Sequence, residues 1–131
     1  MDTKFETAYH ELEASHFWFR CRRELICKLL TTSPKNSKIL DVGCSTGILL
    51  EMLENKGFDS SNLFGIDISE AAIEQSKERG LRNTSVMDAE DFEILEQFDV
   101  IIASDCLEHI DREDLALKTW GRHLKPNGKL I

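Results

Sequence analysis

Acidic and small polar side chains recur where short apolar segments of this chain end. They are Asp41, Asp67, Asp88, and Ser104 with Asp105. A carboxylate accepts hydrogen bonds from hydroxyl, amine and amide donors, so such a series could hold a ligand that is rich in donors. A single acid in such a place is more often a helix N-cap or a solvated loop residue. Four successive segment ends of this kind instead predict a polar crevice lined by carboxylates.

A glycine-flanked loop, GCSTG at 43–47, follows the first of these segments. Glycine lets a backbone approach a ligand closely, and the start of the helix that follows would favour an anion. However, the loop lacks the Gly-Lys-Ser/Thr of a Walker phosphate site. The G-x-G-x-x-G spacing of a dinucleotide site also fails, at Ser45 and Ile48. The loop therefore does not predict a bound pyrophosphate.

Two acids beside this loop indicate another ligand. Asp41 precedes the loop, where it would repel a pyrophosphate and attract an ammonium group. Asp67 lies 20 residues beyond Gly47, where a carboxylate can accept hydrogen bonds from both hydroxyls of a ribose. A ligand with an amine, a ribose and an adenine but no phosphate fits these demands. S-adenosylmethionine is such a ligand.

Apolar periodicity places these residues on alternating strands and helices. We expect strands at 38–42, 62–66, 84–87, 98–104 and 129–131, a turn at 125–128, and helices at 48–55, 69–80 and 112–124. One or two further helices are expected between Phe5 and Leu30. Alternation of this kind implies right-handed crossovers and a parallel sheet. The predicted fold class is α/β, a doubly wound parallel sheet with helices on both faces, in which ligands bind beyond the carboxyl ends of the strands.

Composition limits the partners of the chain. Its 131 residues suit one domain, with 41% hydrophobic and 31% charged residues. A net charge of −8 argues against nucleic acid and against a polybasic membrane surface. The longest aliphatic run, 100–103, is too short to span a bilayer. The N-terminus does not resemble a signal peptide, and the four cysteines form no CxxC pair, so we expect reduced thiols and a cytoplasmic protein.

Five segments together resemble the motifs of class I S-adenosylmethionine-dependent methyltransferases. They are ILDVGCSTG at 39–47, FGIDIS at 64–69, MDAED at 87–91, FDVIIASDCLEHI at 98–110 and LKPNGKL at 124–130. In addition, HFWFR at 16–20 with Arg22 is similar to an N-terminal helix that closes over the cofactor in small-molecule and cofactor-biosynthesis methyltransferases. The resemblance implies a Rossmann-like sheet of strand order 3-2-1-4-5. It also implies two parts, an N-terminal helical segment at 1–35 covering the cofactor site and a cofactor-binding core at 36–131.

The resemblance also implies roles for particular residues. Asp67 would hold the ribose, and Ile68 would either cover the adenine or belong to the core. Asp88 and the Ala89 amide would meet the adenine edge, with Glu90 or Asp91 as alternative acids. The whole set of cofactor-binding residues is Asp41, Gly43, Cys44, Gly47, Asp67, Ile68, Asp88, Ala89, Ser104, Trp18 and Arg22.

Several of these residues have more than one interpretation. Asp41 would orient the loop and meet the amino group through water. Trp18 would be a lid over the cofactor or a core anchor, and Arg22 would meet the methionine carboxylate. The thiols of Cys44 and Cys106 would take no part in the chemistry, since nothing near them in sequence lowers a thiol pKa beyond a helix start.

His109 has three possible roles. It could cap or pack the start of the following helix, or act as a general base near the methyl acceptor. It could also join Asp105 and Glu108 in a metal site, because Asp-x-x-Glu-His resembles the Glu-x-x-Glu-His of some metal-assisted O-methyltransferases. We predict no metal, since further ligands are missing, and we keep His109 as the candidate catalytic residue.

The predicted activity is methyl transfer from S-adenosylmethionine to a small-molecule acceptor, with S-adenosylhomocysteine as product. The chain stops within an apparent strand at Ile131, whereas family members add two further strands, so we expect a fragment. Two alternatives follow: a truncated, non-catalytic cofactor-binding domain, or an NAD(P)-dependent oxidoreductase, which the failed glycine spacing disfavours. The open sheet edge would allow a homodimer.

Overall fold

The computed structural model describes residues 2–131. The chain forms two compact units, one ending at Ser33 and one running from Pro34 to Ile131. Each is described by itself. None of the helices in the described residues is long and apolar enough to cross a membrane.

The N-terminal unit is a pair of helices, α1 (Thr3–Ser15) and α2 (Phe17–Leu29). His16 separates them because its backbone is extended, with φ −70° and ψ 135°, and its imidazole accepts a hydrogen bond from the Trp18 amide at 3.3 Å. The Arg23 guanidinium donates to the Glu13 carbonyl at 2.8 Å and ties α2 to α1. The stretch predicted as one or two helices is thus two.

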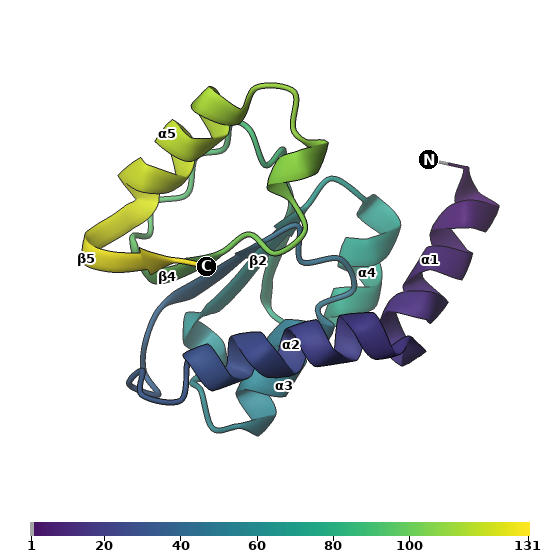
Figure 1. The fold of residues 1–131 in the computed structure, drawn as a ribbon, viewed down its shortest axis with the longest axis horizontal. Coiled ribbons are helices and arrows are strands. Elements are labelled where there is room, and N and C mark those ends of the chain that lie inside the picture. Colours follow the sequence, from purple (N-terminus) through teal and green to yellow (C-terminus); the bar gives the residue numbers. More distant parts are fainter. Residues whose placement is uncertain (1) are drawn as a thin grey trace. The chain divides into compact units, whose positions relative to one another are not determined.

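The second unit is built on a five-stranded parallel sheet of order β3-β2-β1-β4-β5 (Figure 1). Its strands are β1 (Ile39–Val42), β2 (Leu63–Asp67), β3 (Asn83–Val86), β4 (Phe98–Ile102) and β5 (Leu124–Leu130). The central strand β1 is fully buried, as its short and mostly apolar run predicts, and Asp41 is buried with its apolar neighbours. The predicted α/β class and strand order are confirmed.

Helices α3 (Ile48–Asn55), α4 (Glu70–Glu78) and α5 (Glu113–His123) connect the strands, together with the short 3-10 turns η1 (Ser60–Asn62) and η2 (Leu107–His109). The Ser69 hydroxyl accepts from the Ala72 amide at 3.1 Å, so Ser69 is the N-cap of α4, as predicted. Gly80 follows that helix with φ +91°.

The two faces of the sheet carry different contacts because side chains alternate along a strand. Leu40 and Val42 of β1 share a buried cluster with Trp120 of α5. On the other face, a Cβ added at Gly65 of β2 would lie 2.8 Å from a methyl carbon of Leu50 in α3. The core therefore has one layer under α5 and another under α3.

The turn predicted at 125–128 lies inside β5 as a bulge. Leu124 pairs with Phe98, but Lys129 pairs with Val100, so four residues of β5 face one of β4. Asn127 supports the bulge with a left-handed backbone at φ +64°. The last strand therefore begins at Leu124 and not at Lys129, because the ladder with β4 resumes on both sides of the bulge.

Candidate functional site

Two backbone hydrogen bonds hold the loop 43–47 against the end of β2. The amides of Gly43 and Cys44 both donate to the carbonyl of Ile66, at 2.8 and 2.9 Å. Gly65 makes room for this loop, since a Cβ there would lie 2.8 Å from Cys44 Sγ. Sequence reasoning did not assign Gly65 a role, although a glycine inside an apolar strand is a known signal of close backbone approach.

Asp67 connects this loop to the start of α4. One carboxylate oxygen accepts from the Ser45 amide and the other from the Ser69 amide, both at 2.9 Å. Each carboxylate oxygen has two lone pairs, so a second donor can bind to each. Asp67 is half-buried, and it can serve as loop organiser and ligand acceptor at the same time.

The two loop glycines have different surroundings. Gly47 is buried with φ +81°, and a Cβ there would lie 2.3 Å from a methyl carbon of Leu81 and 3.2 Å from Ser76 Cβ. Gly43 is exposed with φ +75°, and the nearest atom to its Cβ position is Cys106 Sγ at 3.6 Å. Gly47 thus packs the start of α3 against protein, whereas Gly43 is the glycine that a ligand could approach.

Carboxylates of three segments surround the Cys106 thiol beside Gly43. Burial, and after it the negative charges of Asp41, Asp67 and Glu108, together raise the pKa of Cys106 to about 11. Asp41 is itself buried within β1. Two of the acids predicted at the strand ends, Asp41 and Asp67, thus lie near enough to one thiol to raise its pKa, and the Cys106 thiol is protonated at neutral pH.

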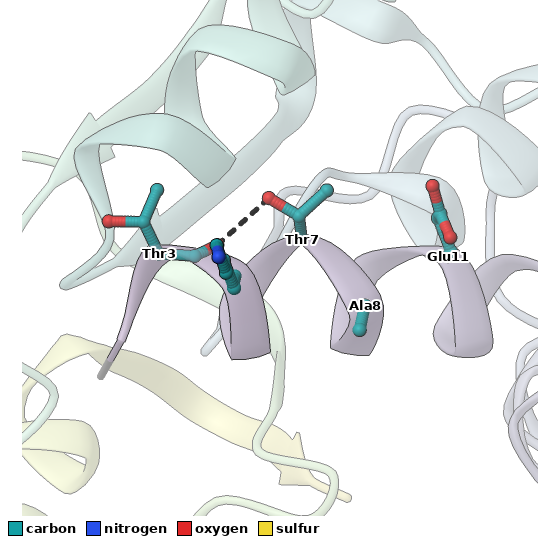
Figure 2. A pocket seen from close by; sticks show the side chains of 5 residues that line it. Thr3, Thr7, Ala8 and Glu11 are labelled. Carbon is teal, nitrogen blue, oxygen red and sulfur yellow. Dashed lines mark hydrogen bonds between the residues drawn. The ribbon is translucent and has the colours of Figure 1, made fainter.

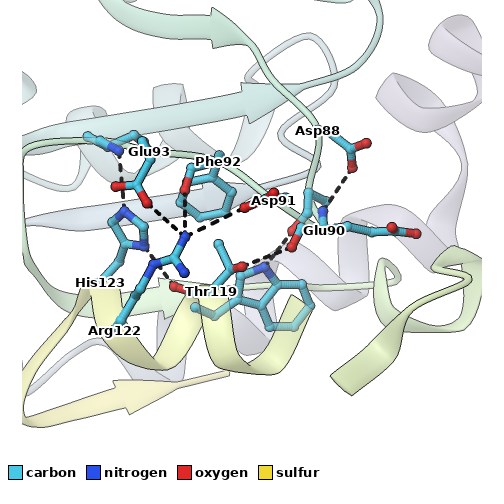
Figure 3. A network of polar contacts seen from close by, with 11 residues as sticks. Asp88, Glu90, Asp91, Phe92, Glu93, Thr119, Arg122 and His123 are labelled. Atoms are coloured by element: carbon cyan, nitrogen blue, oxygen red, sulfur yellow. Dashed lines mark hydrogen bonds and ion pairs between the residues drawn. The ribbon is translucent and has the colours of Figure 1, made fainter. Parts of the chain in front are cut away.

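The loop after β3 contains the three acids proposed for the adenine edge. The Glu90 carboxylate pairs with Arg112 at 2.8 Å, and that of Asp91 lies 3.6 Å from an Arg122 nitrogen. The Asp88 carboxylate is exposed and accepts from the Glu90 amide at 2.9 Å (Figure 3). The two alternatives are thus occupied by arginines, and Asp88 remains the predicted adenine contact.

Three further residues complete the candidate site. Ile68 follows Asp67 and is 75% exposed, so its interpretation as a core residue is wrong. Ala89 is half-buried, and its carbonyl accepts from the Trp120 indole nitrogen at 2.9 Å. Ser104 is half-buried just beyond β4. Ile68 therefore offers an apolar surface next to a carboxylate.

His109 does not cap the following helix. The N-cap of α5 is Arg112, which makes no side-chain capping bond. His109 ends η2, and its amide donates to the Cys106 carbonyl at 3.1 Å while its side chain is exposed. Within residues 2–131 no three His, Cys, Asp or Glu side chains form a group that could hold a metal ion.

Trp18 and Arg22 belong to the N-terminal unit. Trp18 is 58% exposed, so it is not a core anchor. The Arg22 guanidinium lies 5.0 Å from the centre of the Phe19 ring, in a cation–π arrangement. Their contact with a cofactor bound at the strand ends stays a prediction, as does the covering role of segment 1–35.

An open depression on this unit is lined by α1 alone. Its lining residues are Thr3, Lys4, Thr7, Ala8 and Glu11 (Figure 2). The Thr7 hydroxyl donates to the Thr3 carbonyl at 2.9 Å, which uses it within its own helix. The depression brings together none of the strand-end acids, so we place the candidate site at the strand ends.

A family comparison agrees with this geometry. Residues 40–131 match the model of a family described as a methyltransferase domain. The chain belongs to this methyltransferase family. The matched region begins in β1 and includes every strand-end acid described above.

Curated and structural relatives are consistent with this membership. The chain is 32% identical over 103 residues to a ubiquinone biosynthesis O-methyltransferase of Coxiella burnetii, covering 74% of this chain and 43% of that protein. It is similar in fold to the N-methyltransferase NodS of Bradyrhizobium japonicum in complex with S-adenosylhomocysteine, with a TM-score of 0.78 and 24% identity over 92% of this chain and 63% of that one. It is also similar to the [4+2]-cyclase SpnF, with a TM-score of 0.74 and 26% identity over 86% and 44% of the two chains. This methyltransferase-family chain thus spans about two fifths of the length of the curated relatives it matches.

Proposed function

We propose that this chain binds S-adenosylmethionine at the strand ends and takes part in methyl transfer to a hydroxyl group of a small molecule. One observation carries the proposal most directly. The Asp67 carboxylate holds the loop 43–47 and the start of α4 by one oxygen each, and each oxygen can accept one more donor. Such a carboxylate suits the two adjacent hydroxyls of a ribose.

The neighbouring residues fit the rest of the cofactor. The exposed Ile68 side chain would cover one face of the adenine, and Asp88 with the Ala89 amide would meet its edge. Asp41 and the surrounding carboxylates favour the positively charged amino and sulfonium groups over a phosphate. Ser104, at the end of β4, would lie beside the methionine part.

The residues around the acceptor would handle a proton. When bound, S-adenosylmethionine supplies an electrophilic methyl group on its sulfonium sulfur. His109 is exposed at the end of η2, where a neutral imidazole would take the hydroxyl proton of the acceptor. The high pKa of the Cys106 thiol, about 11, keeps this sulfur protonated and a poor nucleophile, so it would not compete for the methyl group.

The nature of the acceptor follows from the relatives and the charge. The curated relatives are named ubiquinone biosynthesis O-methyltransferases, which supports an oxygen acceptor on a small organic molecule. The net charge of −8 disfavours nucleic acid as the acceptor.

The open edge of the sheet would also allow a homodimer. Light scattering of the chain as it elutes from a sizing column would detect it.

Calorimetric titration with S-adenosylhomocysteine tests the proposed cofactor. We expect micromolar affinity and no measurable heat with NADH, since the loop 43–47 lacks the dinucleotide spacing. A folded chain that binds NADH, or that binds neither ligand, would overturn the proposal. Displacement of bound S-adenosylhomocysteine by adenosine would show that the site recognises the adenosine part of the ligand.

A transfer assay then tests the reaction. The likeness to a [4+2]-cyclase means that the fold alone does not fix the chemistry. We expect methyl-labelled cofactor to label catechols and phenols, and a His109→Gln variant to lose transfer while retaining cofactor affinity. Binding without transfer to any acceptor would favour the non-catalytic alternative.

A further inference from the structure

Side chains on one face of α5 form a series of hydrogen bonds with the backbone of the loop that follows β3. Four side chains of the helix each contact a backbone group of the loop (Figure 3). The pairs are Trp120 with the Ala89 carbonyl at 2.9 Å, Thr119 with the Glu90 carbonyl at 2.9 Å, Arg122 with the Phe92 carbonyl at 3.4 Å, and His123 with the Ile94 amide at 3.2 Å. The helix thus fixes the path of the loop as far as Ile94.

The helix side of this contact is rigid. Trp120 is 1% exposed and belongs to the buried cluster that also contains Phe98 and Ile101 of β4. Thr119 is fully buried, and its carbonyl is within 2.7 Å of the Nδ1 atom of His123. A side chain held in a close-packed core has one position from which to donate. The donors Thr119 and Trp120 thus stay in place when the loop moves, so its movement breaks their hydrogen bonds.

The Ala89–Glu90 peptide is held from both of its polar sides. Its carbonyl accepts from the Trp120 indole, and its N–H, the amide of Glu90, donates to the Asp88 carboxylate. Because a peptide unit is planar, fixing the carbonyl fixes the direction of the N–H. The N–H in turn orients the Asp88 carboxylate. Trp120, buried in the core, thus controls the direction of an exposed acid.

We propose that Trp120 and Thr119 are positioning residues that set the purine specificity of the site. They hold the Ala89 and Glu90 carbonyls, and so aim the Asp88 carboxylate at the exocyclic group of the purine ring. A 6-amino group donates to such a carboxylate, whereas a 6-oxo group presents a second acceptor and is repelled. This inference rests on the proposed function, because it takes the ligand to be an adenine-containing cofactor.

The test compares two ligands that differ at the purine 6-position and, in consequence, at N1, which carries a hydrogen in the 6-oxo form. S-adenosylhomocysteine carries the amino group and S-inosylhomocysteine the oxo group. We expect the wild-type chain to prefer the adenine ligand by roughly tenfold or more, the effect of one well-placed hydrogen bond to a charged acceptor. The measured quantity is the ratio of the two dissociation constants from calorimetry.

Trp120→Phe is the principal variant, since it keeps an aromatic ring in the core and removes only the indole donor. We expect it to reduce the preference to roughly twofold to threefold, mainly by weakening the adenine ligand. Thr119→Val, which keeps the shape of the side chain, should reduce the preference in the same direction. Leu117→Ala, an exposed position on the same helix, is the matched control and should keep the wild-type ratio.

The outcomes separate the two levels of the proposal. If the wild-type chain binds neither ligand, the proposed function fails. If it prefers the adenine ligand and both donor variants keep that preference, the positioning role is overturned while the cofactor assignment stands. A merely structural role would weaken both ligands by the same factor and leave the ratio unchanged, which also overturns it. The dissociation constants of a variant are compared only after circular dichroism shows that the variant unfolds in a cooperative thermal transition. If Trp120→Phe does not fold, Thr119→Val carries the test.

Discussion

The backbone amide of Ser45 donates to the side-chain carboxylate of Asp67 at 2.9 Å. The loop after β1 and the end of β2 are therefore one structural unit, although the two residues come from different strand–loop segments. Any change to the Asp67 carboxylate acts on the loop, and under the proposed function it acts on the bound cofactor as well. Stability and ligand binding should respond together at this position.

We predict that Asp67→Asn lowers both quantities. The second carboxylate oxygen of Asp67 already accepts a hydrogen bond from the Ser69 amide. An asparagine has only one oxygen, so its NH₂ group would face a backbone donor whichever way the amide is turned. We expect a loss of about 1–2 kcal/mol in the free energy of unfolding by urea. We also expect at least roughly tenfold weaker S-adenosylhomocysteine binding by calorimetry.

Asp59→Asn is the matched control. Asp59 also accepts from a backbone amide two residues ahead, but a single oxygen serves both the amide and the hydroxyl of Ser61. An asparagine keeps that oxygen, so binding and stability should stay near wild-type. Equal losses in the two variants would show that Asp67 has only a local capping role.

We predict that Gly47→Ala destabilises the chain far more than Gly57→Ala. Both glycines have positive φ, +81° and +95°, so both substitutions incur backbone strain of about 1 kcal/mol. Only at Gly47 would the new methyl group meet protein, 2.3 Å from a Leu81 methyl carbon, whereas nothing lies within 4 Å at Gly57. The difference between their urea midpoints isolates the steric term. If the two midpoints agree, the packing role of Gly47 is refuted.

We predict that the Cys106 thiol is alkylated slowly at neutral pH. Burial and the nearby carboxylates raise its pKa to about 11, so at pH 8 only about a thousandth of it is thiolate. Mass spectrometry after iodoacetamide treatment should show the exposed Cys21 modified first. The rate at Cys106 should still be rising at pH 10. An inflection below pH 9 would contradict the arrangement of acids around this thiol.

A second variant tests the source of this shift in pKa. Glu108→Gln removes one of the three negative charges that raise the Cys106 pKa, so the inflection should move to lower pH. The sign for stability follows from the same shift. An unfolded thiol ionises near its ordinary pKa of 9.0 and the folded one only near 11, so the contribution of Cys106 to stability is lost as pH rises through this interval. Cys106→Ser should show less of this alkaline loss.

Local signals in the sequence were sufficient for the elements around the site. The helix predicted at 48–55 matches α3, and Ser69 caps α4, because an amphipathic period and an N-cap depend on neighbouring residues. The strand order required the family resemblance in addition, since alternation of elements predicts a parallel sheet without ordering its strands.

Features that depend on distant contacts were not predictable in this way. Gly47 is constrained by Leu81, which is far along the chain. The bulge at Asn127 exists because β5 must stay in register with β4 on both sides of it. Ile68 illustrates the same limit, because an apolar residue at a strand end is equally compatible with burial and exposure. Its exposed fraction of 75% is decided by the fold.

We predict that Glu90 contributes to stability in a pH-dependent way. The Arg112 side chain donates to one carboxylate oxygen at 2.8 Å, and the Asp111 and Arg112 amides donate to the other at 3.1 and 3.3 Å. The Arg112 hydrogen bond lowers the pKa of Glu90, with smaller contributions from the two amides, and this outweighs the opposing effect of burial. Glu90 thereby connects the loop after β3 to the residues that precede α5.

The sign of the pH effect follows from this lowered pKa. The folded chain keeps Glu90 ionised to lower pH than the unfolded chain does, so its contribution is complete above the ordinary glutamate pKa and is lost as pH falls through the folded value. Between pH 6 and pH 3, roughly the range over which glutamates titrate, Glu90→Gln should therefore lose less stability than the wild-type chain. At pH 7 it should be the less stable of the two, because its NH₂ group must face a donor. Glu74→Gln, at an exposed position of α4, is the control and should follow the wild-type curve. Parallel curves for wild type and Glu90→Gln, measured by thermal unfolding across this range, would show that the contact with Arg112 does not persist in solution.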